Sequence, residues 1–200
     1  MILFLRWKSL SRDFYGASMN PVRLLLFFLI AAVVLLAVPF PLQAGGSYQA
    51  KTVVLKNREY GESLIQGIRN ARTSIVCSFY LFKITDAKGN QPRRIAEELI
   101  LAGKRGVAVT VILERDSGKS DHLNEENRRT AAFLSRKGVK VFFDSPSVIT
   151  HAKVAVIDGR YVYLGSHNLT QSALMRNNEL SVRIDSPEMA EEISAYLESL

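Results

Sequence analysis

From residue 51 onward, apolar runs typical of β-strands alternate with segments of helical periodicity, and this alternation limits the possible folds more than any other feature. The predicted strands cover residues 51–55, 73–82, 107–113, 139–143, 151–157, 160–165 and 178–184. The predicted helices cover residues 62–71, 93–106, 128–138 and 186–200. This order indicates an α/β fold in which one mixed β-sheet is sandwiched between helices.

Residues 45–200 are expected to form one domain. The polar segment 114–127 predicts a loop that leads into the helix at 128–138, and Asp158-Gly159 predicts a tight hairpin turn. The sequence has no internal repeat. A domain of this length can bury a core without disulfides or metal.

Residues 1–44 carry the pattern of an export signal or a membrane anchor. Fifteen uncharged apolar residues, 24–38, follow four basic residues and precede a segment of prolines and small residues. Fifteen helical residues span about 22 Å, against about 30 Å for a hydrocarbon core, so a cleaved signal peptide and a retained anchor both stay open. Met19 offers an alternative start. In either case we expect residues 45–200 to be exported, to the periplasm or the extracellular space, or to be held at the membrane.

The charge of the chain is mildly basic. Its formal net charge of +7 falls to +4 without residues 1–44, which hold four basic residues and one acidic residue. This excess is compatible with a polyanionic partner but does not require one. Three basic pairs could contact a phosphate backbone: Arg93-Arg94, Lys104-Arg105 and Arg128-Arg129. It is equally consistent with the sequence that these pairs lie on solvated helix faces.

Cys77 is the only cysteine, which excludes an intramolecular disulfide and a cysteine-based zinc site. Its apolar neighbours predict a buried thiol with a packing role. The sequence offers no convincing cluster of metal ligands, so we expect neither a metal nor a cofactor.

The segment 151–170 places reactive side chains in a strand-like context. Residues two apart in a strand share a face, so His151 and Lys153 project together. The strand 160–165 returns antiparallel and brings Ser166 and Asn168 to the same end. An imidazole, an ammonium, a hydroxyl and a carboxamide in one space suit a tetrahedral oxyanion, and phosphate is the natural candidate.

Each of these residues also has a simpler interpretation. A single histidine in a strand is often a core residue, but Lys153 on the same face as His151 makes a pure packing role costly. Asp158 fits the hairpin turn equally well, and Glu179 could be an exposed strand carboxylate. His122, in an acidic segment, is expected on the surface.

The run "HAKVAVID" followed by "GSHN" resembles the HKD signature of the phospholipase D superfamily. The segments "ARTSIVCSFYLF", "AGKRGVAVTVILERD" and "NNELSV" are similar to counterparts in the small single-motif nucleases of that superfamily. The resemblance covers residues 50–200 and implies the phospholipase D/nuclease-like fold with a phosphodiesterase activity. The loop 83–94 is longer than in the smallest of these nucleases.

The resemblance also implies roles for the residues that match the motif. His151 would attack phosphorus and form a phosphohistidine, while Lys153, Ser166 and Asn168 would bind the phosphate, with Ser166 hydrogen-bonded within the site. Glu179, in "NNEL", would accept a proton from the imidazole and orient it, as carboxylates do for catalytic histidines. Asp158 belongs to the motif but is expected to have a structural role. The chemistry would need no metal.

These roles predict a metal-independent endonuclease acting on DNA or RNA. The alternatives are a phospholipase D-type hydrolase of phospholipid head groups, which the apolar N-terminus would hold at its substrate, and a non-catalytic phosphate-binding module. A phosphohistidine mechanism needs an acid on the far side of phosphorus. Because neither His122 nor His167 has a lysine two residues on, we expect the acid to be His151 of a second copy, in a homodimer with a shared active site.

Overall fold

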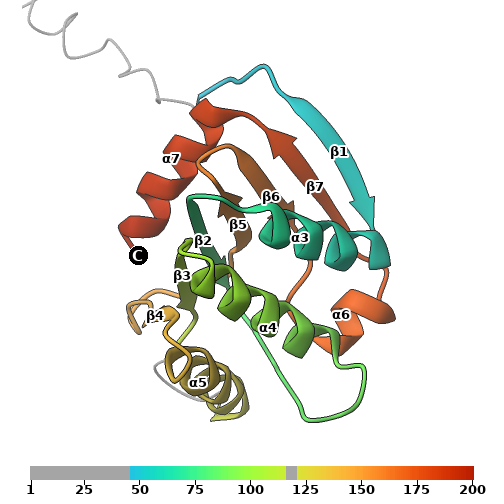
Figure 1. Ribbon diagram of the computed structural model, residues 1–200, viewed down its shortest axis with the longest axis vertical. Helices are drawn as coiled ribbons and strands as arrows, with labels where there is room; N and C mark the ends of the chain where they lie inside the picture. The colour runs from blue at the N-terminus through green and yellow to red at the C-terminus, as the bar shows by residue number, and fades with distance from the viewer. Residues whose placement is uncertain (1–45, 116–120) are drawn as a thin grey trace, which may run out of the picture. The chain divides into compact units, whose positions relative to one another are not determined.

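One mixed sheet of seven strands organises the computed structural model, which describes residues 46–115 and 121–200 (Figure 1). The strands are β1 (Lys51–Lys56), β2 (Ser74–Phe79), β3 (Ala108–Leu113), β4 (Lys140–Phe143), β5 (Lys153–Ile157), β6 (Tyr161–Gly165) and β7 (Leu180–Asp185). Their order across the sheet is β1-β7-β6-β5-β2-β3-β4. β2, β3 and β4 are parallel, and the other neighbouring pairs are antiparallel. The predicted mixed sheet is confirmed.

Helices cover both faces of this sheet, as predicted. The helices are α3 (Arg58–Asn70), α4 (Gln91–Lys104), α5 (Asp121–Ser135), α6 (Gln171–Met175) and α7 (Pro187–Glu198). The first four contribute to one large apolar core, with Ile68, Leu99 and Leu134 among its fully buried side chains. On the other face, α7 packs Ala190 and Leu197 into a second, smaller core. Figure 1 shows α7 apart from α3 and α4, on the opposite side of the strands.

Several of these helices begin at side-chain caps. Asn90, Thr170 and Ser186 each accept a hydrogen bond from the backbone N–H three residues later, at 2.9 Å, 3.2 Å and 3.2 Å. Each such cap satisfies an N–H group that the first helical turn leaves open, which stabilises a helix by about 1 kcal/mol. Pro92 and Pro187 occupy first-turn positions, where the missing N–H costs nothing.

The strand directions bring several chain segments to one end of the sheet, which we call the site edge. The carboxyl ends of β1 to β4, the carboxyl end of β6 and the amino ends of β5 and β7 all meet there. Lys153 is paired with Phe79, and Gly165 with Ser181. The residues that directly precede β5 and directly follow β6 therefore lie close together.

Most element ends differ by a few residues from the sequence prediction, and three differences are larger or bear on the site. α5 begins at Asp121, inside the segment 114–127 that its polar composition predicted to be a loop. The short helix α6 was not predicted. β5 begins at Lys153 rather than at His151, so the histidine lies outside the regular strand.

The prediction for residues 1–44, a signal peptide or an anchor, lies outside the described residues. Within residues 46–115 and 121–200, no helix combines the length and the hydrophobicity that crossing a membrane requires.

Candidate active site

His151 and Lys153 contact each other at the site edge. His151 is exposed and lies two residues before Lys153, which opens β5 and is only 7% exposed. The Lys153 ammonium donates to the His151 carbonyl oxygen at 2.7 Å, and its Nζ lies 3.1 Å from His151 Nδ1. The two motif residues thus form one hydrogen-bonded unit, which leaves Nε2 as the ring nitrogen directed away from the lysine.

Burial lowers the pKa of both side chains. For His151 the larger cause is loss of hydration, and the positive charge of Lys153 lowers the pKa further. For Lys153, burial lowers the pKa, and the negative charge of Glu179 opposes that shift. A lowered histidine pKa keeps the imidazole neutral at neutral pH, so a nitrogen lone pair is available for nucleophilic attack.

Ser166 and Glu179 form a second unit of the site edge. The Ser166 hydroxyl donates to the Glu179 carboxylate and accepts the Leu180 N–H at 3.1 Å. The Asn177 side chain donates to the same carboxylate at 3.1 Å. Within the described part of the chain, Glu179 makes no hydrogen bond to His151, and its charge acts on Lys153 instead.

The side chain of Asn168 has a polar atom without a hydrogen-bond partner among the described residues. This atom is the side-chain oxygen, and it is buried. A buried amide oxygen without a donor is costly unless water or a ligand N–H or O–H satisfies it, whereas a phosphate oxygen would be bound by the NH2 group of the same side chain. Asn168 follows the strand that delivers Ser166, so this group belongs to the same edge.

Asp158 does not join these residues. It occupies the β5–β6 turn, at the end of the hairpin remote from His151, with a left-handed φ of 56°. Its carboxylate accepts hydrogen bonds from the backbone N–H groups of Arg72, Thr73 and Ser74 at 2.8–3.1 Å and from the Thr73 hydroxyl at 3.0 Å. Burial alone would raise the pKa of Asp158, but these hydrogen bonds together outweigh it, so the pKa is lowered. The structure thus assigns Asp158 to the attachment of the hairpin to the start of β2.

His167 is also structural. It is fully buried, its ring stacks on Tyr60 at 4.4 Å, and burial lowers its pKa. Nε2 lies 2.9 Å from the Asn57 carbonyl oxygen, so this nitrogen donates, and Nδ1 accepts the Ser181 hydroxyl at 2.7 Å. Both ring nitrogens are therefore engaged in holding the loop between β6 and α6.

Sequence reasoning missed two residues that shape the site. Asn57, at a left-handed φ of 53°, accepts the Glu179 N–H through its side chain at 2.9 Å. The Tyr80 ring lies 4.5 Å from the His151 ring, and Lys153 Nζ lies 5.1 Å from its centre. The signal for Tyr80 was its place just past the carboxyl end of a parallel strand, where α/β sheets commonly bind ligands.

The basic pairs considered from sequence are largely engaged elsewhere. Arg93 pairs with Asp86 and Glu97, and Arg94 with Glu62. Arg129 pairs with Glu125, and the remaining pair, 104–105, closes α4 at the sheet end opposite the site edge. These pairs therefore fit solvated helix faces better than substrate contacts. His122 is exposed, as predicted, and lies near Lys83 and Glu126.

Cys77 is a free, buried thiol, as predicted, and burial raises its pKa to about 12. No group of three or more His, Cys, Asp or Glu side chains in residues 46–115 and 121–200 is arranged to hold a metal ion.

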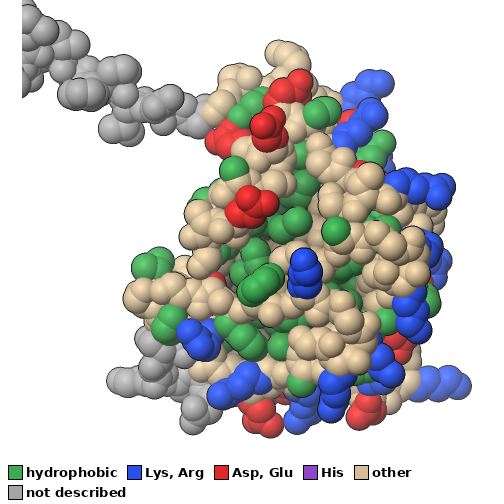
Figure 2. Space-filling model, turned by 60° about the vertical axis from the view of Figure 1, so that its left-hand side comes forward, with side chains coloured by type: hydrophobic (Ala, Val, Ile, Leu, Met, Phe, Trp, Pro, Cys, Tyr) green, Lys and Arg blue, Asp and Glu red, His purple; other side chains and the backbone are tan. Residues whose placement is uncertain are grey.

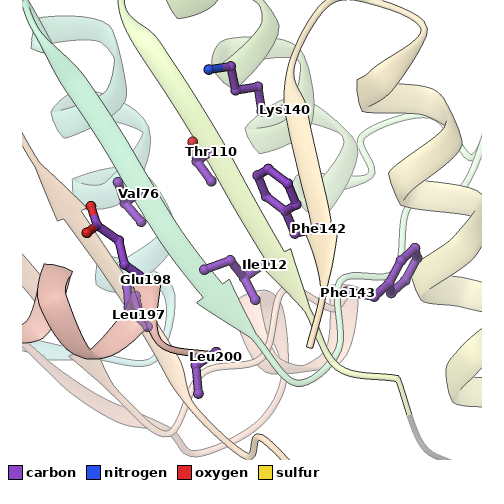
Figure 3. Close-up of a pocket in the computed structure, with 9 residues that line it drawn as sticks. All are labelled: Val76, Thr110, Ile112, Lys140, Phe142, Phe143, Leu197, Glu198 and Leu200. Atoms are coloured by element: carbon purple, nitrogen blue, oxygen red, sulfur yellow. The ribbon is translucent and has the colours of Figure 1, made fainter. Parts of the chain in front are cut away.

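The α7 face carries an apolar hollow of about 400 Å³ beside the end of the helix. Ile112, Phe142 and Leu197 contribute apolar walls and Lys140 a charge (Figure 3). Figure 2 shows hydrophobic side chains exposed on this side of the molecule. None of the candidate site residues His151, Lys153, Asp158, Ser166, Asn168 and Glu179 lines the hollow, so it is distinct from the candidate active site.

Comparison with known sequences places the motif in a family. A family model described as the phospholipase D-like domain of cardiolipin synthase matches residues 64–200. The phospholipase D of Rickettsia conorii is 35% identical over 115 residues, which are 56% of this chain and 52% of that protein. The mitochondrial cardiolipin hydrolase of Danio rerio is 28% identical over 127 residues, 63% of this chain and 50% of that protein. The chain spans about half the length of these curated relatives.

Solved structures agree with this placement. Nuc from Salmonella typhimurium, a phospholipase D family member, is 26% identical, with a TM-score of 0.62 over 76% of this chain and 93% of that chain. NucT from Helicobacter pylori is 26% identical, with a TM-score of 0.61 over 76% of this chain and 95% of that chain. Because the family model covers more than half of the chain, and the fold agrees with it, this chain belongs to the phospholipase D superfamily.

Proposed function

We propose that this chain is a phosphodiesterase that hydrolyses nucleic acid through a phosphohistidine on His151. The observation that carries the proposal is the contact between the buried Lys153 ammonium and the His151 imidazole at 3.1 Å. A nucleophile and a phosphate-binding cation side by side are what phosphoryl transfer requires. A module that only binds phosphate would need no nucleophile, which argues against the non-catalytic alternative.

The reaction proceeds in two displacements. Once the ring proton is on Nδ1, the lone pair of His151 Nε2 attacks phosphorus and an N–P bond forms. The bond from phosphorus to the leaving oxygen breaks, and an acid protonates that oxygen. Water then attacks phosphorus, the N–P bond breaks, and the conjugate base of the acid takes the water proton. Lys153 and Asn168 stabilise the non-bridging oxygens, with Ser166 hydrogen-bonded beside them. Loss of one such donor typically lowers the rate about 10²–10³-fold.

The acid is proposed to come from a second copy of the chain. Of the three histidines, His167 is buried with both ring nitrogens engaged, and His122 lies beside Lys83 and Glu126. A two-fold axis at the site edge would place His151 of a second copy on the far side of phosphorus.

Exposed apolar side chains at the site edge support such an interface. Ile149, Leu164 and Leu180 are 65%, 41% and 58% exposed. They flank, along the chain, the segments that carry His151, Ser166 and Glu179. Apolar side chains gathered beside polar catalytic groups favour a covered surface, and a homodimer with a shared active site would cover it.

Charge at the site edge favours nucleic acid as the substrate. Four exposed basic side chains lie at or next to strand and helix ends there and form no ion pair within the described residues: Lys56, Arg58, Arg115 and Arg176. A polyanionic backbone that passes over the site would neutralise them, and its affinity should fall with salt concentration.

Phospholipid is the second candidate substrate. The same exposed apolar side chains could contact a lipid surface, and the relatives include proteins named phospholipase D and cardiolipin hydrolase. A side-by-side assay on single-stranded DNA, duplex DNA and phospholipid vesicles distinguishes the two. We expect cleavage of DNA that persists in excess EDTA; release of head groups without DNA cleavage would favour the lipid function, and loss of activity on chelation would contradict the mechanism.

Sedimentation and mixed chains test the shared site. We expect a dimer in solution, with turnover falling as dilution separates the subunits. An active strict monomer would contradict the proposed acid and require one within the chain.

A further inference from the structure

Tyr80 is fixed against the catalytic segment by its backbone. Its N–H donates to the carbonyl oxygen of Ala152, the residue between His151 and Lys153, at 3.0 Å. Its carbonyl oxygen accepts the side-chain amide of Asn127 at 2.9 Å. Asn127 is fully buried and also accepts the Phe82 N–H at 2.9 Å, so the position of Tyr80 is set by the fold and not by the substrate.

The Tyr80 ring touches both members of the catalytic unit. Its centre lies 4.5 Å from that of the His151 imidazole, at an interplanar angle of 58°. The same ring lies 5.1 Å from Lys153 Nζ, within the range of a cation–π contact. One side chain, directly after β2, therefore borders the nucleophile and the phosphate-binding cation at once.

We propose that Tyr80 is a positioning residue of the phosphodiester site, whose ring holds the His151 imidazole and the Lys153 ammonium in the relative geometry that attack on phosphorus needs. The proposal rests on the proposed function of His151 and Lys153. It names a residue outside the HKD motif, and it assigns the effect to the aromatic ring, which makes both contacts, and not to the hydroxyl.

The ring acts on the two residues by different means. It shields one side of the imidazole from water, and loss of hydration is the larger cause of the lowered pKa of His151. It also attracts the ammonium through its π electrons, which opposes rotation of the flexible lysine side chain. Among the described residues, the charged or titratable groups that act on this pair are Lys153 itself, Tyr80 and Glu179.

Two substitutions separate the ring from the hydroxyl. Tyr80→Phe keeps the ring, whereas Tyr80→Leu removes it and retains an apolar side chain. A matched control is Tyr161→Leu, because Tyr161 also contacts cations, Arg160 and Arg183, but lies at the opposite end of β6 from the site edge. If Tyr80→Leu does not fold, Tyr80→Met replaces it.

The first measurement is an NMR titration of His151 in the 200-residue chain, assigned through His151→Gln. We expect Tyr80→Phe and Tyr161→Leu to match the wild type, and the His151 pKa to rise in Tyr80→Leu as water reaches the imidazole. An unchanged His151 pKa in Tyr80→Leu would overturn the proposal. This readout needs no turnover, so it stays informative even if the chain hydrolyses none of the substrates offered.

The second measurement is the hydrolysis of bis(p-nitrophenyl) phosphate. We expect kcat to fall about tenfold in Tyr80→Leu with KM within about twofold, while Tyr80→Phe keeps at least about half of the wild-type kcat. A rise in KM alone would mean that Tyr80 contacts substrate and would overturn the positioning role. A loss in Tyr80→Phe equal to that in Tyr80→Leu would assign the effect to the hydroxyl and overturn it as well.

Discussion

Lys153 Nζ lies 3.1 Å from Nδ1 of His151 and donates to the carbonyl oxygen of the same residue at 2.7 Å. An ammonium can only donate, so Nδ1 is the acceptor, and the proton of the neutral ring is on Nε2. The attack proposed for Nε2 requires the ring to change tautomer, so that the proton moves to Nδ1. In the proposed mechanism the free site is therefore a resting state, and a bound phosphate would draw Lys153 away from Nδ1.

The resting state predicts one tautomer for His151. In the free protein, ¹⁵N NMR should show Nε2 protonated and Nδ1 as an acceptor. Lys153→Met should abolish this preference because the donor to Nδ1 is lost. A wild-type ring with its proton on Nδ1 would contradict the observed contact.

The pH dependence of kcat/KM follows from the lowered pKa of His151. The attacking ring must be neutral while the His151 proposed as the acid must carry a proton, so kcat/KM should be bell-shaped in pH, with an acidic limb below the ordinary histidine value of about 6.5. In Lys153→Met one cause of the lowering is gone, so the acidic limb of the residual activity should move to higher pH. An acidic limb above the ordinary histidine value in the wild type would contradict a lowered pKa for His151.

Asp158→Ala should reduce stability and leave the chemistry intact, since its carboxylate accepts hydrogen bonds from Arg72, Thr73 and Ser74, far from His151. Loss of these bonds leaves backbone donors without partners and should cost about 1–3 kcal/mol in urea unfolding. The matched control is Asp86→Ala at an exposed ion pair, which should change stability by less than about 0.5 kcal/mol. A folded Asp158→Ala protein without activity would show that Asp158 takes part in the chemistry of the site.

The same carboxylate contributes a pH-dependent part of the stability. Its pKa in the folded chain is lowered, so the stabilisation is present above its unfolded value and is lost as the pH falls through the folded value. The unfolding free energies of wild type and Asp158→Ala should therefore converge at acidic pH. Parallel curves over the whole range would show that the charge plays no part.

Export is a separate prediction from residues 1–44. We expect a C-terminal reporter that is active only in the cytoplasm to remain dark, because the basic flank should stay inside while the rest crosses. A bright reporter would contradict export of residues 45–200.

Local patterns predicted the strands well because each sheet strand is a short apolar run. They failed at the start of α5, whose first two turns hold many polar residues. These turns are fixed by Leu123 and by the buried Asn127, which bonds to Phe82 and Tyr80 of another segment. They also failed at α6, which is too short to show a helical period. Such elements depend on contacts between residues far apart in the chain.

The site could be predicted only where its residues are close in sequence. His151, Lys153, Ser166 and Asn168 fall within or beside one hairpin, so the alternation of a strand and its return placed them together. Tyr80 lies beside them because β2 pairs with β5, and this pairing of distant segments could not be predicted from the sequence.

A chemical quench of the working enzyme tests the central claim most directly. With DNA as substrate, denaturation at high pH during turnover should trap a phosphoryl-linked nucleotide on the peptide that contains His151, and mass spectrometry should locate it on that histidine. His151→Ala should show neither adduct nor turnover while still binding DNA. Full activity in His151→Ala, or an adduct on another residue, would contradict the account.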